Sequence, residues 1–198
     1  MTQTIRSFPP RARFSQSIGP IFLMLASAFL MTGCSLLGQD GDPALHAMFT
    51  FEESKEEWTG AFSDYPAHMD DGGLRLTFER RSLPSDVDAE GQALYLQGRN
   101  ESDNLFMYLK RKVTGLKPNT TYNVTYHLDI ASNGSANCAG IGGSPGGAVW
   151  VKVGASSVEP ISEQNDEGRY RMNVDKGGQS NGGENAVGTG TAENGAEE

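Results

Sequence analysis

Several features are scarce in this sequence of 198 residues, and each scarcity argues against one class of structure or partner. The longest apolar run, residues 21–31, has eleven residues, whereas a membrane-spanning helix needs about 20, so a permanent span is not expected. Acidic side chains outnumber basic ones, 25 to 16, which argues against a nucleic-acid partner because phosphate binding requires a basic surface. Two cysteines and three histidines leave few candidates for disulfides or zinc ligands.

The N-terminus is basic and then apolar. Arg6, Arg11 and Arg13 are the only charged residues before position 34, and the apolar run at 21–31 follows them. A basic segment followed by a short apolar segment is the layout of a secretory signal peptide. Residues 1–33 are therefore predicted to direct export from a bacterial cytoplasm.

The apolar run ends in Leu30-Met-Thr-Gly-Cys34, which resembles the lipobox of bacterial lipoproteins. The resemblance implies that diacylglycerol is added to the Cys34 thiol, that the chain is cut after Gly33, and that the new amino group is acylated. Met31 stands where leucine is more usual. Two or three acyl chains anchor a protein stably, at about 0.8 kcal/mol per buried CH₂. The alternative is an ordinary secretory signal, or an uncleaved anchor, with an incidental cysteine.

Lipidation of Cys34 has further consequences. Loss of residues 1–33 leaves 165 residues, one ordinary domain, with a formal charge of −12 because three arginines and no acid are removed. Cys138 becomes the sole free thiol, and we interpret it as a small loop residue. Ser35 replaces the aspartate that usually retains lipoproteins in the inner membrane, which implies outer-membrane sorting in a Gram-negative cell. The expected membrane partner is the lipid bilayer, reached through acylated Cys34.

The remaining sequence alternates apolar and polar residues in short segments separated by turns. A linker at 34–47 precedes a domain at 48–176, predicted as an all-β, antiparallel β-sandwich of the jelly-roll type. The alternation is clearest at Tyr122–Ile130, and Leu105–Leu109 is apolar on both faces, as in a central strand. The seven predicted strands are residues 49–51, 74–78, 94–96, 105–109, 122–130, 149–153 and 170–174.

A jelly roll usually has eight strands or more, and residues 177–198, rich in glycine and glutamate, contain only one large aliphatic side chain. Such a segment cannot bury enough surface to fold alone. Either these residues form a disordered tail, or the chain stops before its closing strands.

The segment Leu116-Lys-Pro-Asn-Thr-Thr-Tyr122 has the L-x-P-x-T-x-Y spacing that precedes a central strand in many sandwiches. In a tyrosine corner the tyrosine hydroxyl bonds to the backbone a few residues upstream. Tyr122 is therefore predicted to be a structural tyrosine corner.

From about Phe49 to Val187 the chain resembles a family of uncharacterised bacterial secreted proteins and lipoproteins, whose members continue with further strand-like sequence. This chain departs from the family by ending early, at Glu198. The departure implies a sandwich that is incomplete at the C-terminus. The opening Phe49–Glu52 with Trp58 and the tyrosine corner are also similar to jelly-roll carbohydrate-binding modules. The family motifs are Phe49-Thr-Phe-Glu52 with Trp58, Ala61-Phe-Ser-Asp-Tyr-Pro66, Ser102-Asp-Asn-Leu-Phe-Met-Tyr-Leu-Lys-Arg111, Gly140-Ile-Gly-Gly-Ser-Pro-Gly146, Lys152-Val-Gly-Ala-Ser156 with Glu159-Pro160, and Met172-Asn-Val-Asp-Lys-Gly177.

No constellation typical of catalysis stands out. His68, beside Asp70 and Asp71, has no second histidine or cysteine at ligand spacing, so an exposed loop is the favoured interpretation. The glycines of 140–147 lack the Lys-Ser/Thr of a phosphate loop and predict a tight connection. Oxygen ligands in 175–184, or Glu52 by analogy with binding modules, offer a structural calcium site, but a solvated loop is the stronger interpretation. No other cofactor or metal is expected.

The remaining functional signal is aromatic. If the valines of 149–153 face the core, Trp150 faces outward, and Tyr95 lies opposite its leucine neighbours. Outward aromatic rings can stack on sugars, although loops can also cover them. The leading hypothesis is thus a lipid-anchored, non-enzymatic protein of the cell envelope that binds a ligand such as carbohydrate. A structural or assembly factor that binds an envelope protein through a sheet edge is the alternative, and a hydrolase is third.

Overall fold

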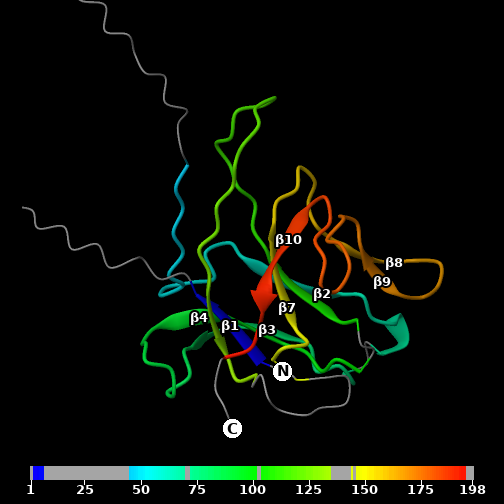
Figure 1. Cartoon of the computed structure of the whole chain (residues 1–198), viewed down its shortest axis with the longest axis horizontal. Helices are drawn as coiled ribbons and strands as arrows, with labels where there is room; N and C mark the ends of the chain where they lie inside the picture. Colours follow the sequence, from blue (N-terminus) through cyan, green and yellow to red (C-terminus); the bar gives the residue numbers. More distant parts are fainter. Residues whose placement is uncertain are drawn as a thin grey trace, which may run out of the picture. The chain divides into compact units, whose positions relative to one another are not determined.

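The computed structural model describes residues 2–6, 45–69, 72–101, 104–134, 144 and 146–194. These residues form an all-β structure with antiparallel strand pairs, which confirms the predicted class (Figure 1). A single turn of 3-10 helix, η1 (Ala67–Met69), is the only helix in the described part of the chain. It follows that no helix in these ranges has the length and apolar character needed to cross a membrane.

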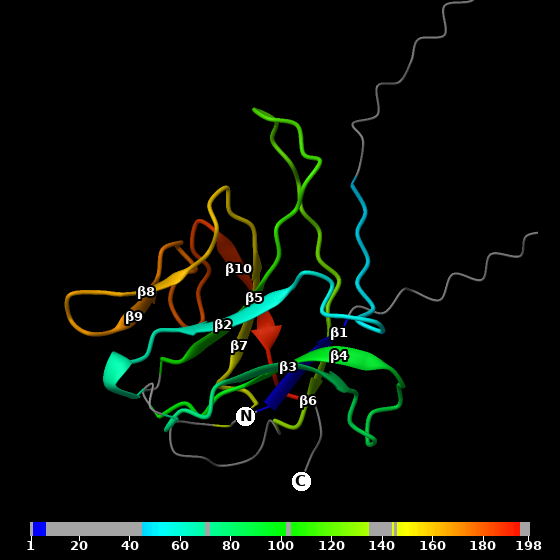
Figure 2. The same ribbon diagram turned by 180° about the vertical axis from the view of Figure 1, so that it is seen from behind.

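The largest sheet has four strands in the order β3-β4-β1-β6 (Figures 1 and 2). All three neighbouring pairs in this sheet are antiparallel. β4 is its best-buried strand, because four consecutive residues, Ala93–Leu96, are all buried, so both of its faces are covered. The strand bounds are β1 (Thr2–Arg6), β3 (Thr77–Ser82), β4 (Gln92–Gln97) and β6 (Asp129–Ser132).

Three two-stranded sheets accompany it. β2 and β5 pair antiparallel, and β2 lies so close to β3 that any side chain at Gly60 would overlap the ring of Phe78. The other pairs are β8 with β9 and β7 with β10. Their bounds are β2 (Thr59–Ser63), β5 (Phe106–Lys110), β7 (Trp150–Gly154), β8 (Ser162–Gln164), β9 (Tyr170–Met172) and β10 (Ala186–Thr191).

The buried apolar core of the described residues is small and centres on β4. Because β5 pairs only with β2 and is mostly half-buried, the expectation that Leu105–Leu109 is a central strand is wrong, and β4 takes that place. The buried apolar side chains are Phe51, Tyr65, Leu74, Ala93, Leu94, Tyr95, Leu96, Tyr108 and Ala192.

Residues 49–51 do not form the predicted strand. The Glu56 carboxylate accepts hydrogen bonds from the amides of Thr50 and Phe51, at 3.0 and 2.7 Å, and thereby takes donors that a sheet would need. Phe51 has a φ of 60°, outside the extended region. The segment is instead irregular, and the Phe49 ring packs edge-on to Trp58 with centroids 5.3 Å apart.

The clearest predicted strand, Tyr122–Ile130, is also mostly absent. Only its last two residues belong to β6, while 111–128, which we name the arm, runs out from the strands and back as a loop (Figure 1). Every side chain from 112 to 128 is exposed. An alternating sequence is able to form a strand with one buried face. Residues 122–128 nevertheless form no strand here, and their side chains stay exposed.

The prediction of a disordered tail is wrong for 177–194, since β10 pairs with β7 through a register shift between Gly188 and Gly190. Backbone pairing orders β10, because Val187 is exposed, and Ala192, the residue after β10, adds a buried side chain. Glycine makes the pairing feasible: a side chain at Gly154 would overlap the carbonyl of Asn185. Residues 195–198 lie outside the described part.

Candidate functional site

A groove of about 490 Å³ lies between the arm and the β7–β10 sheet. Its size is within the range of small-ligand sites. None of its lining residues is charged, although the chain as a whole is acidic. The lining consists of Val124, Thr125, Tyr126, Leu128, Ile130, Val151, Val153, Thr189, Gly190 and Thr191.

Tyr126 connects the two walls of this groove. Its hydroxyl donates a hydrogen bond to the carbonyl oxygen of Gly154, at the end of β7. Partial burial raises the pKa of the Tyr126 phenol, so the hydroxyl stays protonated and able to donate. Tyr126 as a whole is nevertheless 41% exposed, which leaves part of its surface open to a ligand.

The two aromatic residues predicted from parity have different surroundings. Trp150, the first residue of β7, is 39% exposed, whereas Tyr95 is only 7% exposed. The expected outward position of Tyr95 is wrong, because β4 is covered on both faces. The Arg81 guanidinium lies over the Tyr95 ring at 3.9 Å from its centroid, and the Tyr95 hydroxyl bonds to Gln97.

The hydrogen bond of a tyrosine corner is present in the middle of the arm, where the chain turns back. The backbone N–H of Lys117 donates to the hydroxyl oxygen of Tyr122 at 2.6 Å, across five residues. The contact agrees with the predicted structural role of Tyr122. The residues that follow Tyr122 return along the exposed arm and do not form a central strand.

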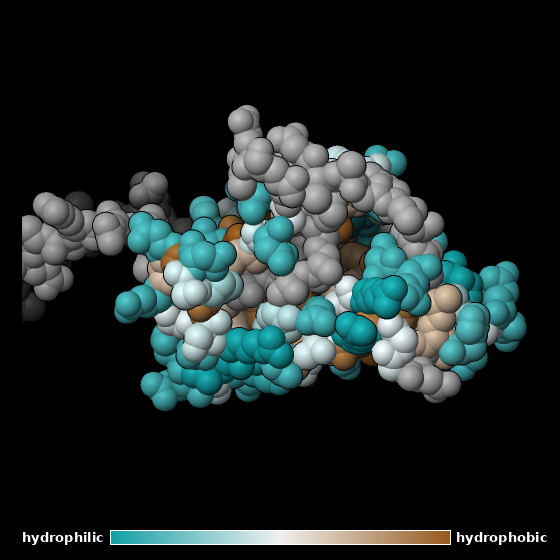
Figure 3. All heavy atoms as spheres, turned by 90° about the horizontal axis from the view of Figure 1, so that it is seen from below, coloured by the Kyte–Doolittle hydropathy of each residue, from teal (hydrophilic) through white to brown (hydrophobic). Residues whose placement is uncertain are grey.

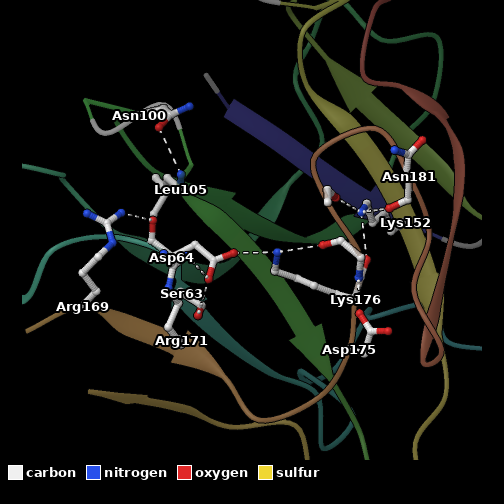
Figure 4. Close-up of polar contacts among 12 residues, drawn as sticks. Ser63, Asp64, Asn100, Leu105, Lys152, Arg169, Arg171, Asp175, Lys176 and Asn181 are labelled. Carbon is white, nitrogen blue, oxygen red and sulfur yellow. Dashed lines mark hydrogen bonds and ion pairs between the residues drawn. The ribbon is translucent and has the colours of Figure 1, made fainter. Parts of the chain in front are cut away.

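Apart from the groove, a cluster of charged side chains surrounds Asp64, the residue that directly follows β2 (Figure 4). Its carboxylate is 8% exposed and lies 2.6 Å from the ammonium of Lys176 and 3.3 Å from the guanidinium of Arg171. Arg169 donates to the backbone carbonyl of Asp64 at 3.3 Å. The backbone of Asp64 has a φ of 64°, a conformation that aspartate tolerates better than most residues.

Lys152 of β7 organises the loop that follows β9 (Figure 4). Its ammonium donates to the carbonyl oxygens of Lys176, at 2.9 Å, of Asn181, at 2.6 Å, and of Gly178. At the base of this loop the Asp175 carboxylate accepts two backbone N–H bonds, both 2.9 Å long, and these lower its pKa below the ordinary value. The Lys152 ammonium thus takes the carbonyl oxygens of the loop that sequence analysis considered for calcium.

These contacts favour a structural role for the Asp64 centre. The Asp64 carboxylate forms ion pairs with two cations of this chain, and the Lys152 ammonium donates to three backbone carbonyls, so both groups already have partners within the fold. Within the described ranges no group of three or more potential ligand residues could hold a metal ion. His68 lies on η1, and its neighbours Asp70 and Asp71 are outside those ranges.

Several predicted residues lie outside the described part of the chain. They include the cleavage and lipidation positions Gly33 and Cys34, the free thiol Cys138 and most of the glycine-rich segment 140–147. Sequence reasoning missed Asp64 and Tyr126. The one available signal for Asp64 was that two of the family motifs, 61–66 and 172–177, contain Asp64 and its partner Lys176.

On the face drawn in Figure 3, hydrophilic residues predominate and hydrophobic ones are scattered among them. Comparison of the chain with protein-family models, with curated proteins and with solved structures found no match.

Proposed function

We propose that this protein is a non-enzymatic ligand-binding protein of the bacterial cell envelope, anchored by lipid on Cys34, with a jelly-roll-like β-sandwich. Its ligand is a neutral carbohydrate, and its site is the groove between the arm and the β7–β10 sheet. The observation that carries the proposal is the uncharged lining of this groove, which combines aliphatic side chains with the exposed ring of Tyr126.

The chemistry of the lining suits a sugar. A sugar ring has an apolar face that packs on aromatic rings, and hydroxyl groups around its edge that need donors and acceptors. Tyr126 supplies the ring, while Thr125, Thr189 and Thr191 supply hydroxyls. Because no charge lines the groove, a neutral ligand avoids the cost of burying an unpaired ion.

The ligand is tested on a glycan array with the full chain carrying Cys34→Ser, which removes the lipid attachment point. Replacement of Tyr126 by alanine removes the ring and is expected to weaken binding about two- to twelvefold, from about 0.5–1.5 kcal/mol of aromatic contact. Val158→Ser is the matched control, since Val158 is 55% exposed and lies outside the groove lining. If the unaltered protein binds no glycan, the carbohydrate proposal fails.

The anchor is tested in cells with a radioactive fatty acid. The unaltered protein should incorporate the label and run as a species shortened by 33 residues, because cleavage is expected after Gly33. Cys34→Ala should incorporate none. Labelling that persists in this variant would exclude the proposed lipid position.

A second function, an assembly factor that binds an envelope protein, is favoured by the arm itself. Three apolar residues of the arm are exposed: Val124 by 56%, Tyr126 by 41% and Leu128 by 39%. None of these residues belongs to a strand. Exposed apolar groups beside unpaired backbone are typical of surfaces that add a partner's strand. Co-purification of a defined partner that Leu128→Ser abolishes, together with an absence of glycan binding, would select this function.

A further inference from the structure

The arm, residues 111–128, exposes a group of large apolar side chains. Val124 is among the most exposed of the group, at 56%, and Tyr122 is the least exposed, at 36%. The group consists of Val113, Leu116, Tyr122, Val124, Tyr126 and Leu128. Single exposed apolar residues are common on protein surfaces, but a group gathered on one projecting segment marks an interaction surface.

The arm also differs in charge from the chain that carries it. It contains three basic residues, Arg111, Lys112 and Lys117, and no aspartate or glutamate. The whole chain has a formal charge of −9, so the remainder without these three cations carries −12. A partner that matches both properties of the arm is apolar in one layer and anionic in the next, and a lipid bilayer with anionic headgroups has this structure.

The far end of the arm joins its two limbs. The chain turns back at residues 118–119, and beside this turn the Lys117 N–H donates to the Tyr122 hydroxyl oxygen at 2.6 Å. Figures 1 and 2 show this end projecting beyond the strands, on the side opposite the loop between β3 and β4. Apolar and basic side chains of both limbs are thus presented together, away from the strands.

We propose that residues 112–124, which we name the tip, bind the surface of a lipid bilayer that contains anionic headgroups. The apolar side chains enter the boundary between headgroups and acyl chains, a depth that suits the ring and hydroxyl of Tyr122. Lys112 and Lys117 are both exposed, and their ammonium groups pair with lipid phosphates while their methylenes lie along the apolar layer. The inference goes beyond the proposed function, because it gives the domain itself a membrane contact.

The base of the arm lies where the chain enters the domain. The Arg111 guanidinium lies over the Phe49 ring, 4.7 Å from its centroid. It also donates to the Glu56 carbonyl oxygen at 2.8 Å and to the Glu57 carboxylate at 2.9 Å. Phe49 is the second residue after the predicted linker that leads from Cys34. A lipid on Cys34 and the tip would therefore hold the same part of the domain to the bilayer.

Projection of the arm lets an acidic domain approach an anionic surface. One limb, residues 111–118, spans up to about 26 Å when it is extended. Charges are screened over about 8 Å at physiological ionic strength. The acidic body can therefore stay up to about three screening lengths from the bilayer while the tip contacts it. Repulsion of the body then does not cancel the attraction of the two lysines.

The test measures whether the tip enters a bilayer. An environment-sensitive fluorophore is attached at Thr121→Cys in the full chain with Cys34→Ser and Cys138→Ser, so all the apolar residues of the tip are kept. The vesicles contain equal amounts of phosphatidylcholine and phosphatidylglycerol, with a lipid that carries a nitroxide quencher in its acyl chain. Because residues 1–33 can also bind vesicles, the readout is quenching at the label. Insertion to interfacial depth should quench the label at least about threefold.

Two matched controls make the measurement specific. A label at Ser85→Cys, an exposed position in the loop between β3 and β4, should be quenched little, because that loop points away from the arm (Figures 1 and 2). Lys112→Gln with Lys117→Gln should raise the lipid concentration for half-maximal quenching about twentyfold, about fivefold for each lysine. Arg75→Gln with Arg99→Gln removes two exposed cations outside the arm and should raise it less than about twofold.

Three results would overturn the proposal: equal quenching at positions 121 and 85, no quenching at 121 on vesicles that carry the chain, or no binding of the chain to the vesicles. In the latter two cases the exposed arm would be left to the protein partner of the second function. Unchanged quenching after removal of both lysines would refute the anionic headgroups. Failure of the proposed function is distinguishable, because Cys34→Ser already removes the anchor and no glycan is present.

Discussion

The ion pair between Asp64 and Lys176 gives a prediction whose size follows from the structure. The Asp64 side chain is 8% exposed, and that of Lys176 is 18% exposed. Removing one member of a buried ion pair leaves an uncompensated charge and costs about 3–5 kcal/mol. The second partner, Arg171, is 46% exposed, so that contact adds at most about 1 kcal/mol. Lys176 retains some contact with water, which lowers the cost. We expect Asp64→Asn to reduce the free energy of unfolding by about 2–3 kcal/mol.

Asparagine is the informative replacement because it removes the charge and leaves the backbone preference nearly unchanged. Asp64 has a φ of 64°, where asparagine is tolerated about as well as aspartate. Alanine would add backbone strain of about 1 kcal/mol and confuse the two effects. The free energy of unfolding is measured by urea denaturation at pH 7, followed by tryptophan fluorescence.

Glu79→Gln is the matched control, because its ion pair with Arg81 is about half-exposed on both sides. This substitution is expected to cost less than about 0.5 kcal/mol. Lys176→Met removes the opposite charge, and the double variant with Asp64→Asn should lose less stability than the two single variants together. A cost for Asp64→Asn no greater than that of Glu79→Gln would refute the argument that this pair holds the loop after β9.

Three further substitutions test the structure through unfolding measurements. Tyr122→Phe removes the hydroxyl that accepts from the Lys117 N–H and should cost about 0.5–1 kcal/mol; unchanged thermal stability would argue against the corner. Leu94→Ala should cost about 2–5 kcal/mol, because Leu94 has no exposed surface, and a smaller loss would mean that β4 is not central. The folded-state pKa of Asp175 is depressed, so its carboxylate stabilises above the ordinary pKa of 3.8, and this contribution is lost as pH falls through the folded value. The difference in unfolding midpoint between the unaltered protein and Asp175→Asn should therefore be present at pH 7 and shrink below about pH 4; a constant difference would exclude the carboxylate as its source.

The all-β class was predictable because alternation and turn residues are local properties. The segment 92–97 was recognised as a strand through Leu94 and Leu96, and 149–153 through its valines. Each of these segments finds a partner in the structure. Boundaries were less predictable, as in residues 74–78, where the strand begins only at Thr77.

Pairing was not predictable, because it joins residues far apart in sequence. Nothing in the composition of residues 186–191 indicates that β10 would pair with β7, and the decisive property is the missing side chain of Gly154. The Asp64 centre was unpredictable for the same reason. Its members come from the end of β2 and from the segment around β9, more than 100 residues later, so no local pattern joins them.

The arm and β4 show why a strand pattern and a strand differ. The arm has the alternation that one buried face requires, yet its side chains are exposed. β4 lacks alternation at Ala93–Leu96, yet it is the most completely buried strand of the described residues, and neighbouring strands pair with both of its edges. One of those neighbours is β1. A strand that is apolar on both faces and has no proline or charge is an aggregation hazard when an edge opens. In the structure β3 and β1 pair with the two edges of β4, so neither edge is open to a further strand.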